Sequence, residues 1–327
     1  MKIAFYSPHL GLRGTEVTMY DFAHYNEEIL QNESIIVYNE SNPVNHPTVI
    51  EKFNMRFPDR VFALKGPDFN FAWQSEHTNP LLDDVMESQN CDALYMQKLG
   101  FNDGVISNKC KTLVLCAGTP CEPHGDKYAY ISDWLAQHAS AGRYPAVPSI
   151  VDLPDIEGDF REILGIPESA TVFGRSGGQD TWNIPWVSQV VHAMVEQRED
   201  IFFVFQNTPQ FFMHSNIKYL PSTADMEFKV KFINTCDAML HARSEGESFG
   251  LSCAEFSLRN KPVITWAGSS DRNHIETLGE KGIYYTDPKE LYNILSTFVK
   301  QPEKDWNAYR HFNPQDIMKI FDEVFLK

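Results

Sequence analysis

Short apolar runs alternate with helical patterns along most of the chain. In the first half, a glycine-containing turn at 11–14 and a predicted helix over 15–30 follow the first apolar run. The runs of strand length cover residues 2–7, 34–38, 61–64, 93–96, 112–115 and 128–132. Continuous apolar strands separated by helices are typical of a parallel sheet that helices cover on both faces.

The pattern changes at residues 142–160, which contain three prolines and no helical period. We interpret this stretch as an interdomain linker. After it the alternation restarts and predicts strands over 171–175, 201–206, 238–242 and 262–266, and helices over 185–198, 224–235, 250–259, 288–299 and 314–325. The sequence therefore predicts two α/β domains, 1–150 and 151–327, and the last helix could pack back on the first domain.

Two such domains, each Rossmann-like and doubly wound, present loops at the carboxyl ends of their strands, where ligands usually bind. We therefore expect the ligand site in a cleft between two such edges.

Composition narrows the function classes. The chain has 327 residues, 43% of them hydrophobic, and a formal net charge of -16. Because a surface this acidic repels nucleic acid and anionic lipid, we expect neither of them as a partner. No apolar run is long enough to span a bilayer, and the start is too polar after Tyr6 for a signal peptide.

The cysteines do not indicate a disulfide framework or a metal site. Six cysteines occur without paired CxxC spacing, which favours reduced thiols and a cytoplasmic protein. Cys116, Cys121 and His124 could form part of a metal cluster, but a fourth ligand is not evident. We expect no metal site.

The most specific stretch is "EGESFGLSCAEF", which holds Glu247 and Glu255 with seven residues between them. It lies between a predicted strand and the start of a predicted helix. The amide groups around Ser248, Phe249, Gly250 and Leu251 would then point out of the helix start and suit a phosphate. An acid, an anion hole and a second acid match a sugar nucleotide, which has hydroxyls at both ends and a diphosphate in the middle.

The segment "GESFGLSCAEFSLRNKPVI" resembles the E-x7-E signature of retaining glycosyltransferases with the GT-B fold, of the family 4 type. Weaker similarities cover most of the chain. "SPHLGLRGTEVTMYDFA" resembles the first glycine-rich loop and helix, with Gly14, Thr15 and Glu16 at a Gly-Gly-Ala-Glu-like position. "EPHGDKYAYIS" resembles the end of the N-terminal domain, and "REILGIPESATVFGR" the entry to the C-terminal domain.

The resemblance implies transfer of a sugar from a nucleotide diphosphate sugar to a hydroxyl acceptor, with retention of configuration and without a metal or other cofactor. The donor would bind the C-terminal domain and the acceptor the N-terminal domain. Glu247 would contact hydroxyls of the sugar, Glu255 the ribose hydroxyls, and Arg175 the diphosphate. Gly14 would let the first loop approach the donor or the acceptor. The leaving diphosphate itself would deprotonate the acceptor, and closure about the linker would exclude water.

One departure concerns the diphosphate. The family usually has a lysine in a Lys-Gly pair a few residues after the arginine, but "GRSGGQDTWNIP" contains no lysine. The backbone amides of Gly177 and Gly178 could form an anion nest instead. Arg243 could supply the missing positive charge.

Other candidate residues have ordinary alternatives. His124 could reach the sugar or the acceptor hydroxyl, or be a loop histidine bonded to backbone. Asp126 could orient His124 or cap the next element. Glu16 could serve only the helix dipole. Lys98 is expected to be solvated, and Glu245 to face solvent.

Two other functions stay open at this level. A sugar-nucleotide epimerase would need acid and base groups near the sugar, and only His124 and the glutamates offer them. A carbohydrate- or nucleotide-binding protein without catalysis is the alternative that the absent lysine motivates. A nicotinamide-dependent oxidoreductase is disfavoured, because the first loop lacks G-x-G-x-x-G spacing.

Overall fold

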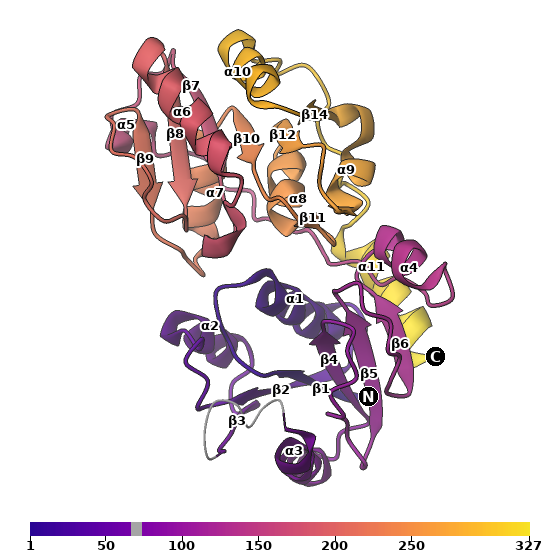
Figure 1. Ribbon diagram of the computed structural model, residues 1–327. Coiled ribbons are helices and arrows are strands. Elements are labelled where there is room, and N and C mark those ends of the chain that lie inside the picture. Colours follow the sequence, from indigo (N-terminus) through magenta and orange to yellow (C-terminus); the bar gives the residue numbers. More distant parts are fainter. Residues whose placement is uncertain (67–73) are drawn as a thin grey trace. The chain divides into compact units, whose positions relative to one another are not determined.

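The computed structural model describes residues 1–66 and 74–327. These residues divide into two compact units, drawn in Figure 1. The N-terminal unit comprises Met1–Ile150 together with Phe312–Lys327, and the C-terminal unit comprises Val151–His311. Residues 142–160 connect the two units and contain no helix. Within this stretch, Ala146 forms an isolated β-bridge with Tyr130.

The N-terminal unit is built on a parallel sheet whose strands lie in the order β3-β2-β1-β4-β5-β6. Apart from the edge strand β3, the strands are largely buried, as expected for a sheet covered on both faces. They are β1 (Lys2–Ser7), β2 (Glu33–Asn39), β3 (Val61–Leu64), β4 (Ala93–Lys98), β5 (Lys111–Cys116) and β6 (Lys127–Tyr130). The helices between and after them are α1 (Gly14–Glu28), α2 (Pro47–Arg56), α3 (Ser75–Gln89) and α4 (Asp133–Ser140).

The segment 312–327 completes the core of the N-terminal unit. It forms α11 (Pro314–Phe321) and the short segment η4 (Asp322–Leu326). The Phe321 ring lies 5.1 Å from that of Phe22 on α1, and the Phe325 ring lies 6.0 Å from that of Tyr95 on β4. Figure 1 shows this segment, in yellow, beside the strands of the N-terminal unit.

The C-terminal unit repeats the plan with a parallel sheet in the order β14-β12-β10-β7-β8-β9. A short parallel pair, β11 (Gly246–Glu247) with β13 (Asp271–Arg272), lies outside it. The sheet strands are β7 (Thr171–Arg175), β8 (Ile201–Gln206), β9 (Ile217–Leu220), β10 (Ala238–His241), β12 (Val263–Trp266) and β14 (Gly282–Tyr285). The helices are α5 (Arg161–Leu164), η2 (Gln179–Thr181), α6 (Pro185–Gln197), α7 (Met226–Thr235), α8 (Leu251–Leu258), α9 (Asn273–Leu278), η3 (Gly279–Lys281) and α10 (Pro288–Thr297).

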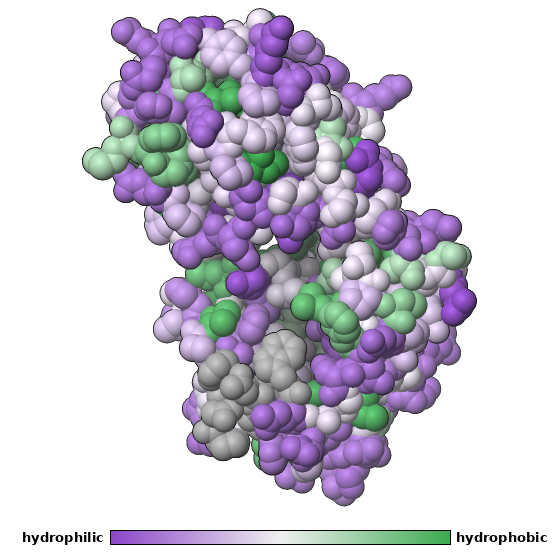
Figure 2. Space-filling model, viewed as in Figure 1, coloured by the Kyte–Doolittle hydropathy of each residue, from purple (hydrophilic) through white to green (hydrophobic). Residues whose placement is uncertain are grey.

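The predicted α/β class is confirmed, and the apolar runs are strands where the pattern placed them. The patterns did not predict the helices α2, α3, α4, α5 and α9, the edge strands β9 and β14, or the short pair β11 and β13. On the visible face the surface is mainly hydrophilic, with small separate hydrophobic areas (Figure 2). Within the described residues, no helix is both long and apolar enough to cross a bilayer.

Candidate functional site

The strand order of the C-terminal unit determines where a ligand site is expected. From β7 the chain runs outward through β8 to β9, then returns to place β10 on the other side of β7. The carboxyl ends of β7 and β10 therefore form the topological switch point, where open α/β sheets bind ligands. Arg175 is the last residue of β7 and His241 the last of β10.

Glu247 lies just beyond this edge, in the short strand β11 rather than in a loop as predicted. Its side chain is 20% exposed, and its carboxylate accepts two hydrogen bonds, from His241 Nε2 at 3.1 Å and from Arg243 Nη1 at 3.0 Å. Burial acts to raise the pKa of Glu247, but the hydrogen bond and charge of His241 and the charge of Arg243 outweigh it and lower the pKa to about 2. Glu247 is therefore an ionised and firmly oriented acceptor.

A chain of hydrogen bonds links Glu247 through His241 to Thr265 and His274. The Thr265 hydroxyl bridges His241 Nδ1 at 2.8 Å and His274 Nε2 at 3.1 Å. Burial, aided by the nearby His241, lowers the pKa of His274 to about 3, so His274 is neutral. Because an ionised carboxylate only accepts, His241 must donate from Nε2 to Glu247. The chain fixes the orientation of the His241 ring and thereby the direction of that bond.

Gly250 precedes α8 and has the left-handed backbone that favours glycine, with φ 92° and ψ 57°. A Cβ atom there would lie 3.2 Å from the Cβ atoms of both Glu247 and His274. The glycine therefore lets the start of α8 lie directly against the Glu247 cluster.

The first turn of α8 has amide groups without partners inside the helix, and these attract anions. Ser248 and Leu251 are half-buried on either side of the turn. The Phe249 side chain is buried against Tyr309, and its carbonyl accepts from Asn273 Nδ2 at 2.9 Å. Any contact of Phe249 with a ligand would thus come from its backbone.

Arg175 is 3% exposed and its guanidinium is occupied by neighbouring loops. Nη1 donates to the Asn207 carbonyl at 3.1 Å and to Thr208 Oγ1 at 2.7 Å. Nη2 donates to the Gly178 carbonyl at 2.7 Å and to Thr181 Oγ1 at 2.6 Å. Burial lowers the pKa of Arg175 to about 10. Arg175 ties the loop after β7 to the loop after β8 and lies close enough to Glu247 to interact with its charge.

Gly177 and Gly178 belong to this Arg175 arrangement. A Cβ at Gly177 would lie 3.1 Å from Arg175 Nη2 and 3.0 Å from Thr181 Oγ1, so the close approach requires glycine. Gly178 directs its carbonyl at Arg175. Arg243 is 32% exposed, and its charge is already paired with Glu247.

Glu255 lies on α8 and is 6% exposed. Its Oε1 accepts a hydrogen bond from Lys229 Nζ on α7 at 2.6 Å. The sequence pattern does not identify Lys229, because the lysine is far from the motif in sequence and no spacing links the two.

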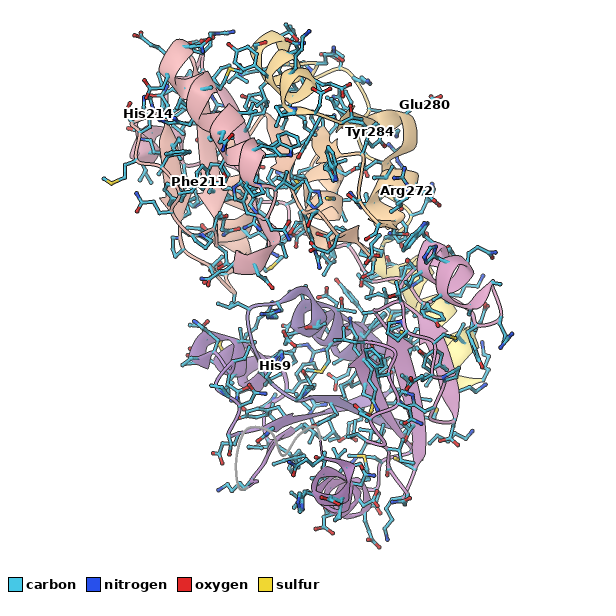
Figure 3. The ribbon with its side chains drawn as sticks, viewed as in Figure 1. His9, Phe211, His214, Arg272, Glu280 and Tyr284 are labelled. Carbon is cyan, nitrogen blue, oxygen red and sulfur yellow. The ribbon has the colours of Figure 1, made fainter. Side chains whose placement is uncertain are left out.

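The N-terminal unit has its own switch point, between β1 and β4. In the loop after β1, His9 Nδ1 lies 3.2 Å from Glu16 Oε1. Glu16 is 2% exposed and also accepts from the hydroxyls of Ser7 and Thr15, so it does more than favour the helix dipole. Gly14 is the first residue of α1. Figure 3 labels His9, which the sequence analysis did not single out.

His124 lies in the loop before β6. Its Nδ1 is 2.7 Å from the Glu122 carbonyl, and burial lowers its pKa. Asp126 caps the neighbouring strand, because its carboxylate accepts from the Thr112 amide at 2.8 Å. Gly125 and Asp126 thus adjoin the amino end of β5, whereas ligands of such sheets bind at carboxyl ends.

Two simpler predictions have clear outcomes. Lys98 is not solvated: its side chain is 7% exposed and donates to Asp103 Oδ1 at 2.5 Å and to the Val105 carbonyl at 2.7 Å. The prediction was wrong because the chain after β4 folds back over the lysine. Glu245 faces solvent as predicted, with a side chain that is 56% exposed.

All six cysteines are free, and Cys116 Sγ donates to the Gly118 carbonyl at 3.1 Å. Across residues 1–66 and 74–327, no group of three or more His, Cys, Asp or Glu side chains is placed to hold a metal ion.

Comparison with solved structures identifies the architecture. The chain is similar to HepE from Anabaena in complex with UDP-glucose, with a TM-score of 0.70, 13% identity, and 99% of this chain and 95% of that chain covered. It is also similar to a glycosyltransferase from Rickettsia africae, with a TM-score of 0.69 and 14% identity. That match covers 99% of this chain and 98% of that chain. For WaaG, a glycosyltransferase involved in lipopolysaccharide biosynthesis, the TM-score is 0.67 and the identity 13%. That match covers 99% of each chain. The chain has the GT-B fold.

Sequence comparison adds no family. No protein-family profile matches this chain, and no curated protein matches it. At these identities the structural similarity establishes the GT-B fold alone.

Proposed function

We propose that this protein is a glycosyltransferase that moves a sugar from a nucleotide diphosphate sugar to a hydroxyl acceptor. The observation that carries the proposal is the set of groups along one edge of the C-terminal unit. An oriented carboxylate, Glu247, stands before the positive end of α8, and a second carboxylate, Glu255, stands one turn into that helix. The GT-B fold supports the same function.

The donor is proposed to lie along these groups in order. Glu247 accepts from hydroxyls of the sugar, and the first-turn amides of α8 bind the diphosphate. Glu255 binds the ribose. UDP is the first nucleotide to test, because HepE was solved with UDP-glucose and MnaA from S. aureus with UDP.

The proposed reaction forms a bond from the acceptor oxygen to the anomeric carbon while the bond from that carbon to the diphosphate breaks. The acceptor proton passes to the departing diphosphate, and configuration is retained. Glu247 is a poor nucleophile, because two hydrogen bonds and a pKa of about 2 hold its charge in place. It acts by orienting the sugar and by its charge. Positive charge near the diphosphate comes from α8, Arg175 and Arg243, so the proposed mechanism uses no metal.

The acceptor hydroxyl is proposed to bind the N-terminal unit at its switch point. His9 supports this, because its ring follows β1 at the switch point, with Nδ1 3.2 Å from Glu16 Oε1, and Nε2 is proposed to interact with the hydroxyl. His124 remains a weaker candidate for the same task, because its loop adjoins the amino end of β5.

Non-catalytic binding of a nucleotide sugar is the second candidate. It is favoured by the engagement of both Nη atoms of Arg175 with protein acceptors and by the missing lysine. A direct contact between Arg175 and a diphosphate would require some of these bonds to be exchanged.

The test combines binding and turnover. Thermal shift with UDP, GDP and their sugars should identify one nucleotide that stabilises the protein, by about 2.7 kcal/mol at a hundredfold excess over Kd. Release of the nucleotide from the matching donor, with hydrolysis or transfer, would establish catalysis, and Glu247→Gln should abolish it while the nucleotide still binds. Binding without release would support the second candidate, and no binding by any nucleotide would refute both.

A further inference from the structure

Lys229 and Glu255 form an ion pair that is largely buried. The Nζ to Oε1 distance is 2.6 Å, and the side chains are 15% and 8% exposed. Removing two charges from water is costly, and a buried pair often stabilises a fold no better than apolar side chains would. A buried pair next to a ligand site therefore suggests a role in binding.

The pair is held rigidly by the two helices that carry it. Lys229 lies on α7 and Glu255 on α8. One turn beyond Lys229, the Phe232 ring packs edge-on against Phe256 at 5.8 Å, and both rings are fully buried. The side chains of the pair thus meet in a fixed geometry.

The pair keeps unused hydrogen-bonding capacity. An ammonium group has three donors and no acceptor, and Lys229 Nζ uses one donor within the described residues. Glu255 Oε2 accepts no hydrogen bond from the described residues. Two donors of Lys229 and one acceptor atom of Glu255 therefore remain side by side.

We propose that Lys229 and Glu255 read the ribose of the donor nucleotide together. One hydroxyl of the vicinal diol donates to Glu255 Oε2, and the other accepts from Lys229 Nζ. This rests on the proposed function, but it replaces recognition by two carboxylate oxygens with recognition by an acceptor and a donor. Lys229 becomes a specificity-determining residue of the site.

The pair predicts how deoxynucleotides behave. Each missing hydroxyl leaves one charged group without its partner, which lowers affinity by about 10- to 100-fold. Because the two hydroxyls have different partners, the two losses should be separable by mutation.

The experiment measures dissociation constants by calorimetry for UDP, 2′-deoxy-UDP and 3′-deoxy-UDP, or for the GDP series if GDP is what binds. The wild type should bind each deoxy form with an affinity about 10- to 100-fold lower than its affinity for the ribonucleotide. Lys229→Met should weaken binding of the ribonucleotide and remove the loss for one deoxy form, while the loss for the other persists. Lys231→Met is the matched control, because Lys231 pairs with Glu227 at the same 2.6 Å on the same helix but with side chains 31% and 60% exposed. It should behave as the wild type.

Three outcomes overturn the inference. If Lys229→Met retains both losses in full, Lys229 does not touch the ribose. If both losses fall together, Lys229 only holds Glu255. If the wild type binds the deoxy forms as well as UDP, the pair does not read the ribose, although the proposed function survives; this comparison needs no variant to fold. Absence of binding by UDP and GDP alike would instead refute the proposed function together with this inference.

Discussion

The hydrogen bond from His241 to Glu247 is the contact on which the charge of the site depends. His241→Asn keeps an amide near the position of Nδ1 and loses the donor at Nε2, whereas His241→Gln can keep that donor. We expect Asn to reduce the free energy of unfolding near neutral pH by about 1–3 kcal/mol, and Gln to reduce it less.

The pH dependence of this effect has a definite sign. The pKa of Glu247 is about 2 in the folded protein against a reference value of 4.5. The stabilisation is therefore fully present above pH 4.5 and is lost as the pH falls toward 2. Urea unfolding at about pH 7 and about pH 3 should show the difference between wild type and His241→Asn shrinking at the lower pH. An equal difference at both values would contradict this account.

A second test at the residue scale distinguishes a structural role of Arg175 from a role in ligand binding. Lysine cannot reproduce a planar fork that donates to two loops at once. Arg175→Lys should lower the free energy of unfolding by about 2–4 kcal/mol in chemical denaturation. Arg198→Lys is the control, since its partner Asp200 is exposed, and it should change stability by less than about 1 kcal/mol. A small effect for Arg175→Lys would mean that the arginine is free to bind a ligand.

At the scale of elements, the junction before α8 joins backbone strain to ligand binding. Gly250→Ala should lower the free energy of unfolding by about 1–2 kcal/mol because of the left-handed backbone. Contact of the added Cβ with Glu247 and His274 should lower it further. Gly165 has a similar backbone, with φ 65°, but nothing lies within 4 Å of an added Cβ. Gly165→Ala should therefore show the backbone cost alone and leave nucleotide affinity unchanged, while Gly250→Ala loses affinity. Equal nucleotide affinity in the two variants would argue against a diphosphate at the start of α8.

The sequence predicted those elements whose burial leaves a strong pattern. The largely buried strands β1, β7 and β8 occur at the predicted residues. Helix α3 was missed because "SEHTNPLLDDVMESQ" carries a proline inside the helix and buries few side chains. Strand β9 was missed because its residues are only partly buried at an edge, where polar and apolar residues mix.

The candidate site divided in the same way. Glu247, Gly250 and Glu255 belong to one continuous motif, so local spacing was enough to suggest them. Lys229 and His274 reach the site from other elements, and only the packing of those elements brings them there. The partners that occupy Arg175 likewise come from loops that local patterns do not connect.

At the scale of the whole molecule, the proposed tasks fall on different units. His9→Gln changes the N-terminal unit, so it should lower the rate of transfer by about 10- to 100-fold and leave the Kd for the nucleotide unchanged. Glu255→Gln changes the C-terminal unit and should weaken nucleotide binding. Calorimetry and a transfer assay on both variants would check the division, and weaker nucleotide binding by His9→Gln would contradict it.

The contribution of residues 312–327 to the N-terminal core has a consequence for biosynthesis. Phe321 and Phe325 are buried against Phe22 and Tyr95, so the N-terminal core lacks part of its packing until this segment is made. The C-terminal unit, Val151–His311, is continuous in sequence. On the ribosome, the half that is synthesised first is therefore expected to be the half that matures last. The N-terminal unit can complete its core only after residues 312–327 are synthesised, and these follow the whole C-terminal unit. Until then it is expected to be a substrate for chaperones.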